Sequence, residues 1–94
     1  MKRLAITEEI WKEGNMYTSY CPELDIATCG HTIEEVKKNL IEVIKIQIEE
    51  TTEMGTLNDF LGKAGYDIES GKDVLELEKE IVQFKKVQVP VGIG

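Results

Sequence analysis

The residues best suited to chemistry stand close together in the chain: Cys29 and His31, the only histidine. Residues two apart in a strand face the same side, so a thiol nucleophile with an imidazole base is conceivable there. Such catalysis also needs a group that orients the base and donors for an oxyanion, and no residues follow at a recognisable spacing. We therefore predict that this pair lies at a surface junction and that the chain is not an enzyme.

The same region offers a metal site only in part. Cys21, Cys29 and His31 form the spacing C-x7-C-x-H, which matches no usual zinc motif and lacks a fourth ligand. If the strands carrying the cysteines pair across the turn between them, the two thiols are too far apart for a disulfide or a shared metal. Gly30 alone before a helix is not a phosphate-binding loop. We expect no metal and no cofactor.

The longest helical pattern starts directly after this cluster. Thr32 is a natural N-cap for the N–H of Glu35, and the Glu35 carboxylate can reach back to the N–H of Thr32, which completes a capping box. Apolar residues then recur at steps of three and four, which predicts one broad stripe that covers a sheet: Ile33, Val36, Leu40, Val43, Ile44 and Ile48.

Three strand patterns precede this helix. Residues 2–12 read as a first strand, and a turn at 13–15 joins them to the aromatic-rich residues 16–21 as a hairpin. Pro22 ends the second strand because it has no N–H to donate. A third strand is expected over 24–28.

The C-terminal half is less regular. Residues 51–55 are expected to break the long helix, with Gly55 suited to a left-handed C-cap, and Thr56 is expected to cap a short second helix that Gly65 ends. Residues 71–86 are ambiguous between helix and strand, and we predict a final strand from about 81 to 91. The predicted fold is α+β: an antiparallel sheet of three to four strands, in the order β-β-β-α-(α)-β, with the main helix packed on one face.

Length and charge narrow the classes of protein. Ninety-four residues predict a single domain, 1–94. The net charge is −7, with 18 acids against 11 bases, which argues against direct nucleic-acid binding and suits a basic protein partner. No apolar run approaches the ~20 residues of a membrane span, and no signal-peptide core follows the first basic residues. We expect a cytoplasmic protein that does not bind membranes.

Two features predict self-association. Leu4, Ile6 and Ile10 share the parity expected to face the helix, which leaves Trp11, a frequent interface anchor, on the opposite face of the sheet. The last strand, ending in VQVPVGIG, offers an edge that a second subunit could pair with. We predict a homodimer or higher homo-oligomer with Trp11, Val87 and Val89 at its interface.

A series of short motifs runs through most of the chain in a fixed order. It comprises an aromatic strand with Tyr17 and Tyr20, the turn Cys21-Pro22-Glu23-Leu24, the helix start Thr28-x-Gly30-x-Thr32-x-Glu34-Glu35-Val36, the helix residues Asn39-Leu40-x-Glu42-x-Ile44, the segment Gly55-Thr56-Leu57-x-x-Phe60-Leu61-x-x-x-Gly65-Tyr66, and a closing Val-x-Val-Pro-Val. This series resembles the HicB-type antitoxin family, in particular its short, stand-alone members.

The chain departs from that family's pattern in two places. The usual Pro-Gly after the P-E-L turn is replaced by Asp25-Ile26, which alters the turn. Longer members carry an appended DNA-binding helix-turn-helix or ribbon-helix-helix, and residues 72–94 are too few and too acidic or β-like for one. The resemblance therefore implies no autoregulation through DNA by this chain alone.

The resemblance implies a stoichiometric antitoxin that binds and occludes a small basic RNA-cleaving toxin of the HicA type. The motifs do not assign the contact residues. Our candidates for partner binding are the Pro22–Asp25 turn and the acidic face of the helix, with the residues Pro22, Glu23, Asp25 and Glu34. The alternative is an orphan oligomerising domain, structural or regulatory, without a toxin partner.

Overall fold

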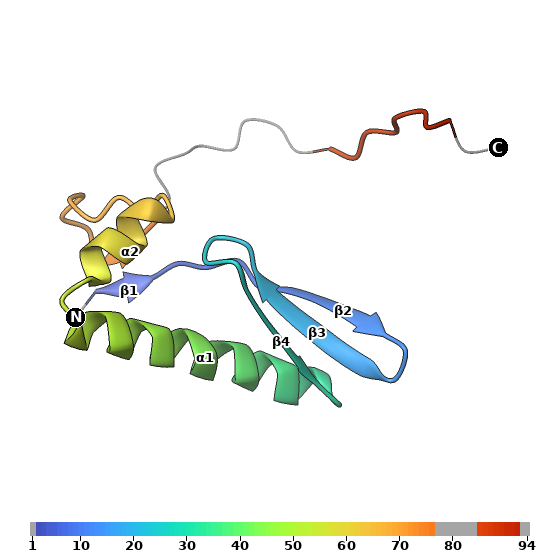
Figure 1. Cartoon of the computed structure of the whole chain (residues 1–94), viewed down its shortest axis with the longest axis horizontal. Helices are drawn as coiled ribbons and strands as arrows, with labels where there is room; N and C mark the ends of the chain where they lie inside the picture. The colour runs from blue at the N-terminus through green and yellow to red at the C-terminus, as the bar shows by residue number, and fades with distance from the viewer. Residues whose placement is uncertain (1, 77–84, 93–94) are drawn as a thin grey trace.

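The structure is a computed structural model that describes residues 2–76 and 85–92. Its elements are β1 (Arg3–Leu4), β2 (Glu9–Glu13), β3 (Met16–Cys21), β4 (Ile26–Gly30), α1 (Ile33–Glu53), α2 (Leu57–Lys63) and β5 (Val74–Leu75). The predicted α+β class is confirmed. Strands β2, β3 and β4 form an antiparallel sheet that packs against α1, and α2 lies with the parallel pair β1–β5 beyond one end of that sheet (Figure 1).

The hairpin predicted around residues 13–15 is present. Glu13 pairs with Met16 across a two-residue turn, in which Gly14 has φ of +60°. Glycine with positive φ at the first central position is the type II′ pattern, whose twist matches that of the flanking strands. The second strand has the predicted bounds.

The third strand begins two residues later than predicted. Cys21 pairs with Ile26, so residues 22–25 form the whole connection between β3 and β4. Asp25 has φ of +53°, a left-handed conformation that reverses the chain before the strand resumes. At the other end, Gly30 closes β4 beside α1, where a Cβ atom would lie 3.1 Å from the Cγ atom of Glu35.

Helix α1 starts as predicted and ends later. The Thr32 hydroxyl accepts a hydrogen bond from the Glu35 N–H at 3.0 Å, but the Glu35 carboxylate accepts from the N–H of His31, at 3.2 Å, and not from that of Thr32. The predicted break at 51–55 is wrong in its first three residues, because α1 continues to Glu53 and the Thr51 hydroxyl bonds back to the Gln47 carbonyl at 2.8 Å. Gly55, with φ of +73°, has the predicted left-handed conformation.

The core between α1 and the sheet uses the centre of the predicted stripe. Val36, Leu40 and Ile44 are buried, whereas Ile33 is 46% and Val43 39% exposed. Three strands cover only part of a helix face, so the margins of the stripe stay in contact with solvent. The residues packed in this first cluster are Cys21, Leu40 and Ile44, with Ile6, Leu24, Ile26 and Ile48 around them.

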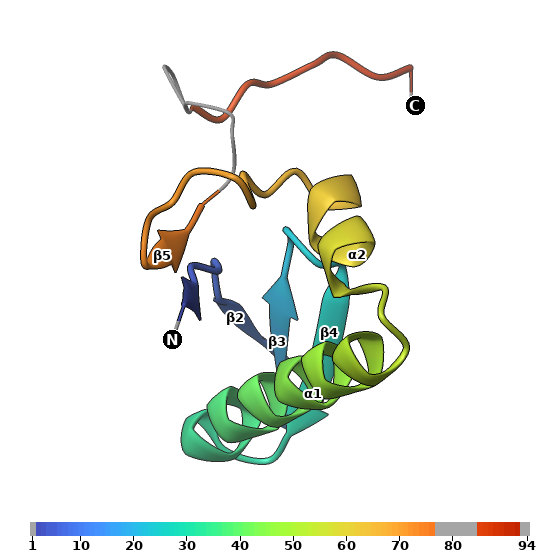
Figure 2. The ribbon, with the colours of Figure 1, turned by 90° about the vertical axis from the view of Figure 1, so that its left-hand side faces the viewer.

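A second cluster joins α2 to both ends of residues 2–76. It contains Leu61, Tyr66 and Leu75, surrounded by Leu4, Leu24, Leu57, Phe60, Ala64 and Ile68. As Figure 2 shows, β1 and β5 lie side by side at one end of the molecule, apart from the strands that cover α1. None of the helices in the described residues is long and apolar enough to cross a membrane.

This second region corrects two predictions. The single strand expected over 2–12 is split, because Arg3 and Leu4 pair with β5 while Glu9–Glu13 pairs with β3. The last strand of the described residues is Val74–Leu75, in the range that the sequence left open between helix and strand. Leu75 fills the second cluster, and its carbonyl accepts from the Ala5 N–H at 3.0 Å. Of the strand predicted over 81–91, residues 81–84 lie outside the described part, and residues 85–91 are not a strand.

Candidate functional site

The turn that carries three of the predicted partner-binding residues is tied to the N-terminal segment. The Glu23 carboxylate accepts from the Thr7 N–H at 2.9 and 3.1 Å and from the Thr7 hydroxyl at 2.6 Å. Burial by itself would raise the pKa of Glu23, but these bonds stabilise the carboxylate and lower its pKa. Glu23 therefore has an internal role, because it fixes the chain between β1 and β2 against the turn.

Asp25 also bonds within the molecule. Its carboxylate accepts from the Tyr20 hydroxyl at 2.8 Å, and this bond raises the pKa of Tyr20. Pro22, Asp25 and Glu34 are exposed, but Glu34 lies in the first turn of α1, near the end of the sheet opposite to the turn. The structure thus does not bring the four predicted residues together, and their role in partner binding stays a prediction.

The residues first considered for chemistry lie apart. Cys21 is buried at the turn, where burial raises the pKa of its thiol and Sγ donates to Glu23 at 3.4 Å. Cys29 is exposed on the face of β4 that points away from α1, opposite Thr18 of β3. His31 is exposed at the start of α1. Within residues 2–76 and 85–92, no group of His, Cys, Asp and Glu side chains could hold a metal ion.

Tyr66 holds the second region to the N-terminal segment, a role that the sequence analysis missed. Its ring is 2% exposed, and its hydroxyl donates to the Ala5 carbonyl at 2.8 Å. Burial raises the pKa of this hydroxyl well above its ordinary value, so it stays protonated as a donor. The position of a large aromatic residue directly after Gly65, the residue expected to end the second helix, is the feature of the sequence that could have predicted this role.

The face of the sheet away from α1 carries an aromatic pair. Trp11 and Tyr20 meet edge to face, with ring centroids 6.4 Å apart, and Trp11 is 39% exposed. Strand register puts Thr18 and Cys29 beside them on this face. The parity predicted for Trp11 is confirmed, since its neighbour Ile10 pairs with Ser19, whose hydroxyl bonds to the Val36 carbonyl of α1.

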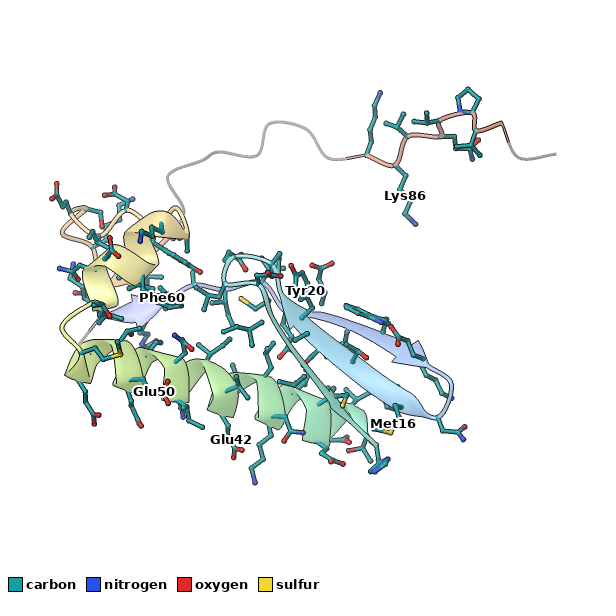
Figure 3. The ribbon with its side chains drawn as sticks, in the orientation of Figure 1. Met16, Tyr20, Glu42, Glu50, Phe60 and Lys86 are labelled. Carbon is teal, nitrogen blue, oxygen red and sulfur yellow. The ribbon has the colours of Figure 1, made fainter. Side chains whose placement is uncertain are left out.

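A second exposed surface runs along α1 on the side of β4. Its position is fixed by Asn39, whose side-chain amide donates to the Cys29 carbonyl at 3.1 Å. At 3.6 residues per turn, the residues that follow Asn39 on the same side are Glu42, Val43, Ile46, Glu50 and Glu53. We call these five residues the acidic flank; Figure 3 shows Glu42 and Glu50 pointing away from the sheet.

The acidic flank combines negative charge with exposed apolar area. Ile46 is 53% exposed. Val43 is 39% exposed, although the predicted stripe placed it in the core. Of the α1 lysines, Lys37 lies on the side of the helix opposite to the acidic flank. Lys38 and Lys45 lie on the side that faces solvent, and Lys38 Nζ reaches the Glu42 carboxylate only at 3.9 Å. Such a surface fits a partner that is basic and apolar at once.

Comparisons with known proteins add nothing to this geometry. No family model, no curated protein and no solved structure matches the chain.

Proposed function

We propose that this chain is a non-catalytic protein-binding module, an antitoxin-like domain of the cytoplasm that neutralises a small basic RNA-cleaving toxin of the HicA type by stoichiometric binding. The observation that carries the proposal is the acidic flank of α1. It offers Glu42, Glu50 and Glu53 for basic side chains and Ile46 for an apolar contact at the centre. The motifs that resemble HicB-type antitoxins supply the class of partner.

Charge and apolar area contribute to different steps of binding. The net charge of −7 steers a basic partner toward the domain, an effect that salt weakens. Exposed Ile46 and Val43 then contribute apolar burial when the partner is seated, worth about 25 cal/mol per Å² removed from water. A long helix held by the sheet presents these groups in a fixed arrangement, so little ordering is needed on binding.

The test is co-expression with the product of the adjacent gene as the candidate basic partner, followed by size-exclusion chromatography and a growth assay. We expect a stable complex that relieves toxicity and dissociates more readily at high salt. Glu50→Lys/Glu53→Lys should weaken the complex by at least about tenfold, because both charges would then repel a basic partner. Glu34→Lys reverses a candidate that was predicted from sequence and lies outside the acidic flank, so it tests the alternative surface and should bind as the wild type does if the flank is the binding surface.

Two results would count against the proposal in different ways. Equal weakening by Glu34→Lys and by the double reversal would move the binding surface back to the residues predicted from sequence. A chain that elutes without the basic protein and leaves toxicity unchanged would favour the alternative, an orphan oligomerising domain.

The absence of catalysis has its own test. The double variant Cys29→Ala/His31→Ala removes the thiol and the imidazole that stand two residues apart in the sequence. Because both side chains are exposed, the fold should survive the change. We expect full neutralisation of the toxin by this variant, and a loss of neutralisation with the complex intact would point to an enzymatic contribution.

A further inference from the structure

Residues 85–92 have the sequence of a strand without a partner in the described chain. Val87, Val89 and Val91 alternate along it and are 68%, 74% and 71% exposed. In an extended chain this alternation puts the three valines on one face. Figure 1 shows the segment running away from the sheet and both helices, and within the described residues no strand pairs with it.

Strand β2 provides a free edge of the three-stranded sheet. It pairs with β3 on one side only. Glu13 and Met16 close a two-residue turn, so their backbone groups bond to each other. Because bonded and non-bonded pairs alternate along an antiparallel ladder, the N–H and C=O groups of Ile10 and Lys12 point away from β3, toward the free edge. The other edge, β4, is less open because Asn39 already bonds to the Cys29 carbonyl.

Charge favours the same pairing. The segment 85–92 carries Lys85 and Lys86 and no acid, whereas residues 2–76 carry 16 acids against 8 bases. Along β2 and the residue before it, the acids Glu8, Glu9 and Glu13 outnumber Lys12, and Lys37 of α1 lies 4.0 Å from the Glu8 carboxylate, so this edge remains net negative. The basic segment is therefore attracted to the domain and to this edge.

We propose that residues 85–92 of one copy add to β2 of a second copy in parallel orientation, and that two copies exchange these segments in a dimer. Pro90 has no N–H, so it must stand where its nitrogen points to solvent, and Val87, Val89 and Val91 then donate to β2. In a parallel pair, a residue whose N–H and C=O bond to the other strand lies opposite a residue whose N–H and C=O point away from that pair. The valines therefore come opposite Glu9, Trp11 and Glu13, and cover the Trp11–Tyr20 pair.

This dimer does not depend on the proposed function, because it uses the β2 edge and not the acidic flank. It also defines how the predicted interface residues Trp11, Val87 and Val89 would meet, across two subunits. Backbone bonds to an exposed sheet edge supply affinity in such complexes, and side chains on one face supply specificity.

The experiment uses the full chain and its single tryptophan. Mass is measured by light scattering after size exclusion, and Trp11 emission is recorded, both over a broad range of protein concentration. We expect a dimer whose emission shifts to shorter wavelength as it forms, because Trp11 leaves water. Val87→Asp/Val89→Asp should weaken dimerisation by at least about tenfold and keep the emission at longer wavelength.

The matched control compares Gln88→Asp with the single variant Val89→Asp, because each adds one negative charge but on opposite faces of the segment. Val89→Asp should weaken the dimer, and Gln88→Asp should leave the dimer and the emission shift in place. Residues 85–92 are exposed throughout, so these variants should keep the circular dichroism of the wild type. A wild-type chain that is monomeric at all concentrations would overturn the proposal. So would a dimer that the double valine variant leaves intact, or one in which Gln88→Asp is as damaging.

Discussion

The two hydrophobic clusters are built from different parts of the chain. The first lies between α1 and the sheet β2–β3–β4, formed by residues between Ile6 and Ile48, and it buries Leu40 completely. The second joins α2 to β1 and β5, so Leu4 and Leu75 meet over 71 residues of chain. Leu24, from the β3–β4 turn, packs against both.

The first region should therefore be more stable against local opening than the second. Contacts between neighbouring segments need little loop closure, whereas β1–β5 pairing must order a long loop for a ladder of two residue pairs. The second region is further fixed by single polar contacts, of which the Tyr66 hydroxyl to the Ala5 carbonyl is one. We expect the second region to open while the first stays folded.

The largest expected effect comes from truncating the first cluster. Leu40→Ala should lower the free energy of unfolding by about 2–5 kcal/mol and destabilise the whole domain, because Leu40 is fully buried. Leu61→Ala should instead speed amide hydrogen exchange mainly in β1, β5 and α2. Urea unfolding and residue-resolved exchange measure the two effects. Equal exchange throughout both regions in Leu61→Ala would mean that the molecule opens as one unit.

The next effect concerns the contact that links the two regions, and it depends on pH. Because the folded pKa of Glu23 is lowered, its bonds to Thr7 contribute stability above the pKa of an unfolded glutamate, and this stability is lost as pH falls through the folded value. Glu23→Gln should cost about 1.5 kcal/mol at neutral pH, the lower end for bonds to a charged group, since the carboxylate is partly exposed.

Urea unfolding as a function of pH checks this. Below the pKa of an unfolded glutamate, the free energy of unfolding of the wild type should fall more steeply with decreasing pH than that of Glu23→Gln. Glu34→Gln, on the exposed surface of α1, is the control and should follow the wild type. Parallel curves for the wild type and Glu23→Gln would show that Glu23 gains nothing from its ionised form.

The same contrast explains what sequence reasoning could reach. The N-cap Thr32, the hairpin at Gly14 and the buried positions Val36, Leu40 and Ile44 follow from local patterns, and the structure contains them. The pairing of Arg3–Leu4 with Val74–Leu75 has no local signal, because two-residue strands carry too little alternation to identify. The alternating valines of residues 85–92 are typical of a strand. A strand also needs a neighbouring strand to pair with, and within the described residues of the same chain none pairs with this segment.

The candidate site shows the same limit. Trp11 was found because parity alone puts it on the open face, and its neighbour Tyr20 was recognised only as an aromatic strand residue. An acidic face of the helix was predicted, but Glu42, Glu50 and Glu53 were not named as its residues, because the position of that face depends on how α1 is rotated against the sheet. Asn39 fixes that rotation through a backbone carbonyl of β4, and a helical pattern does not reveal such a contact.

The smallest expected effect compares the two N-caps, Thr32 of α1 and Thr56 of α2. Thr32 accepts a bond from the Glu35 N–H, so Thr32→Ala should cost about 1 kcal/mol of stability. The Thr56 side chain makes no capping bond and reaches only the Thr51 carbonyl, at 3.5 Å, so Thr56→Ala should cost a few tenths of a kcal/mol at most. Thermal unfolding of the two variants side by side measures the difference. Equal losses would mean that Thr56 caps α2 in solution, and the second region would then be closer in stability to the first than its contacts indicate.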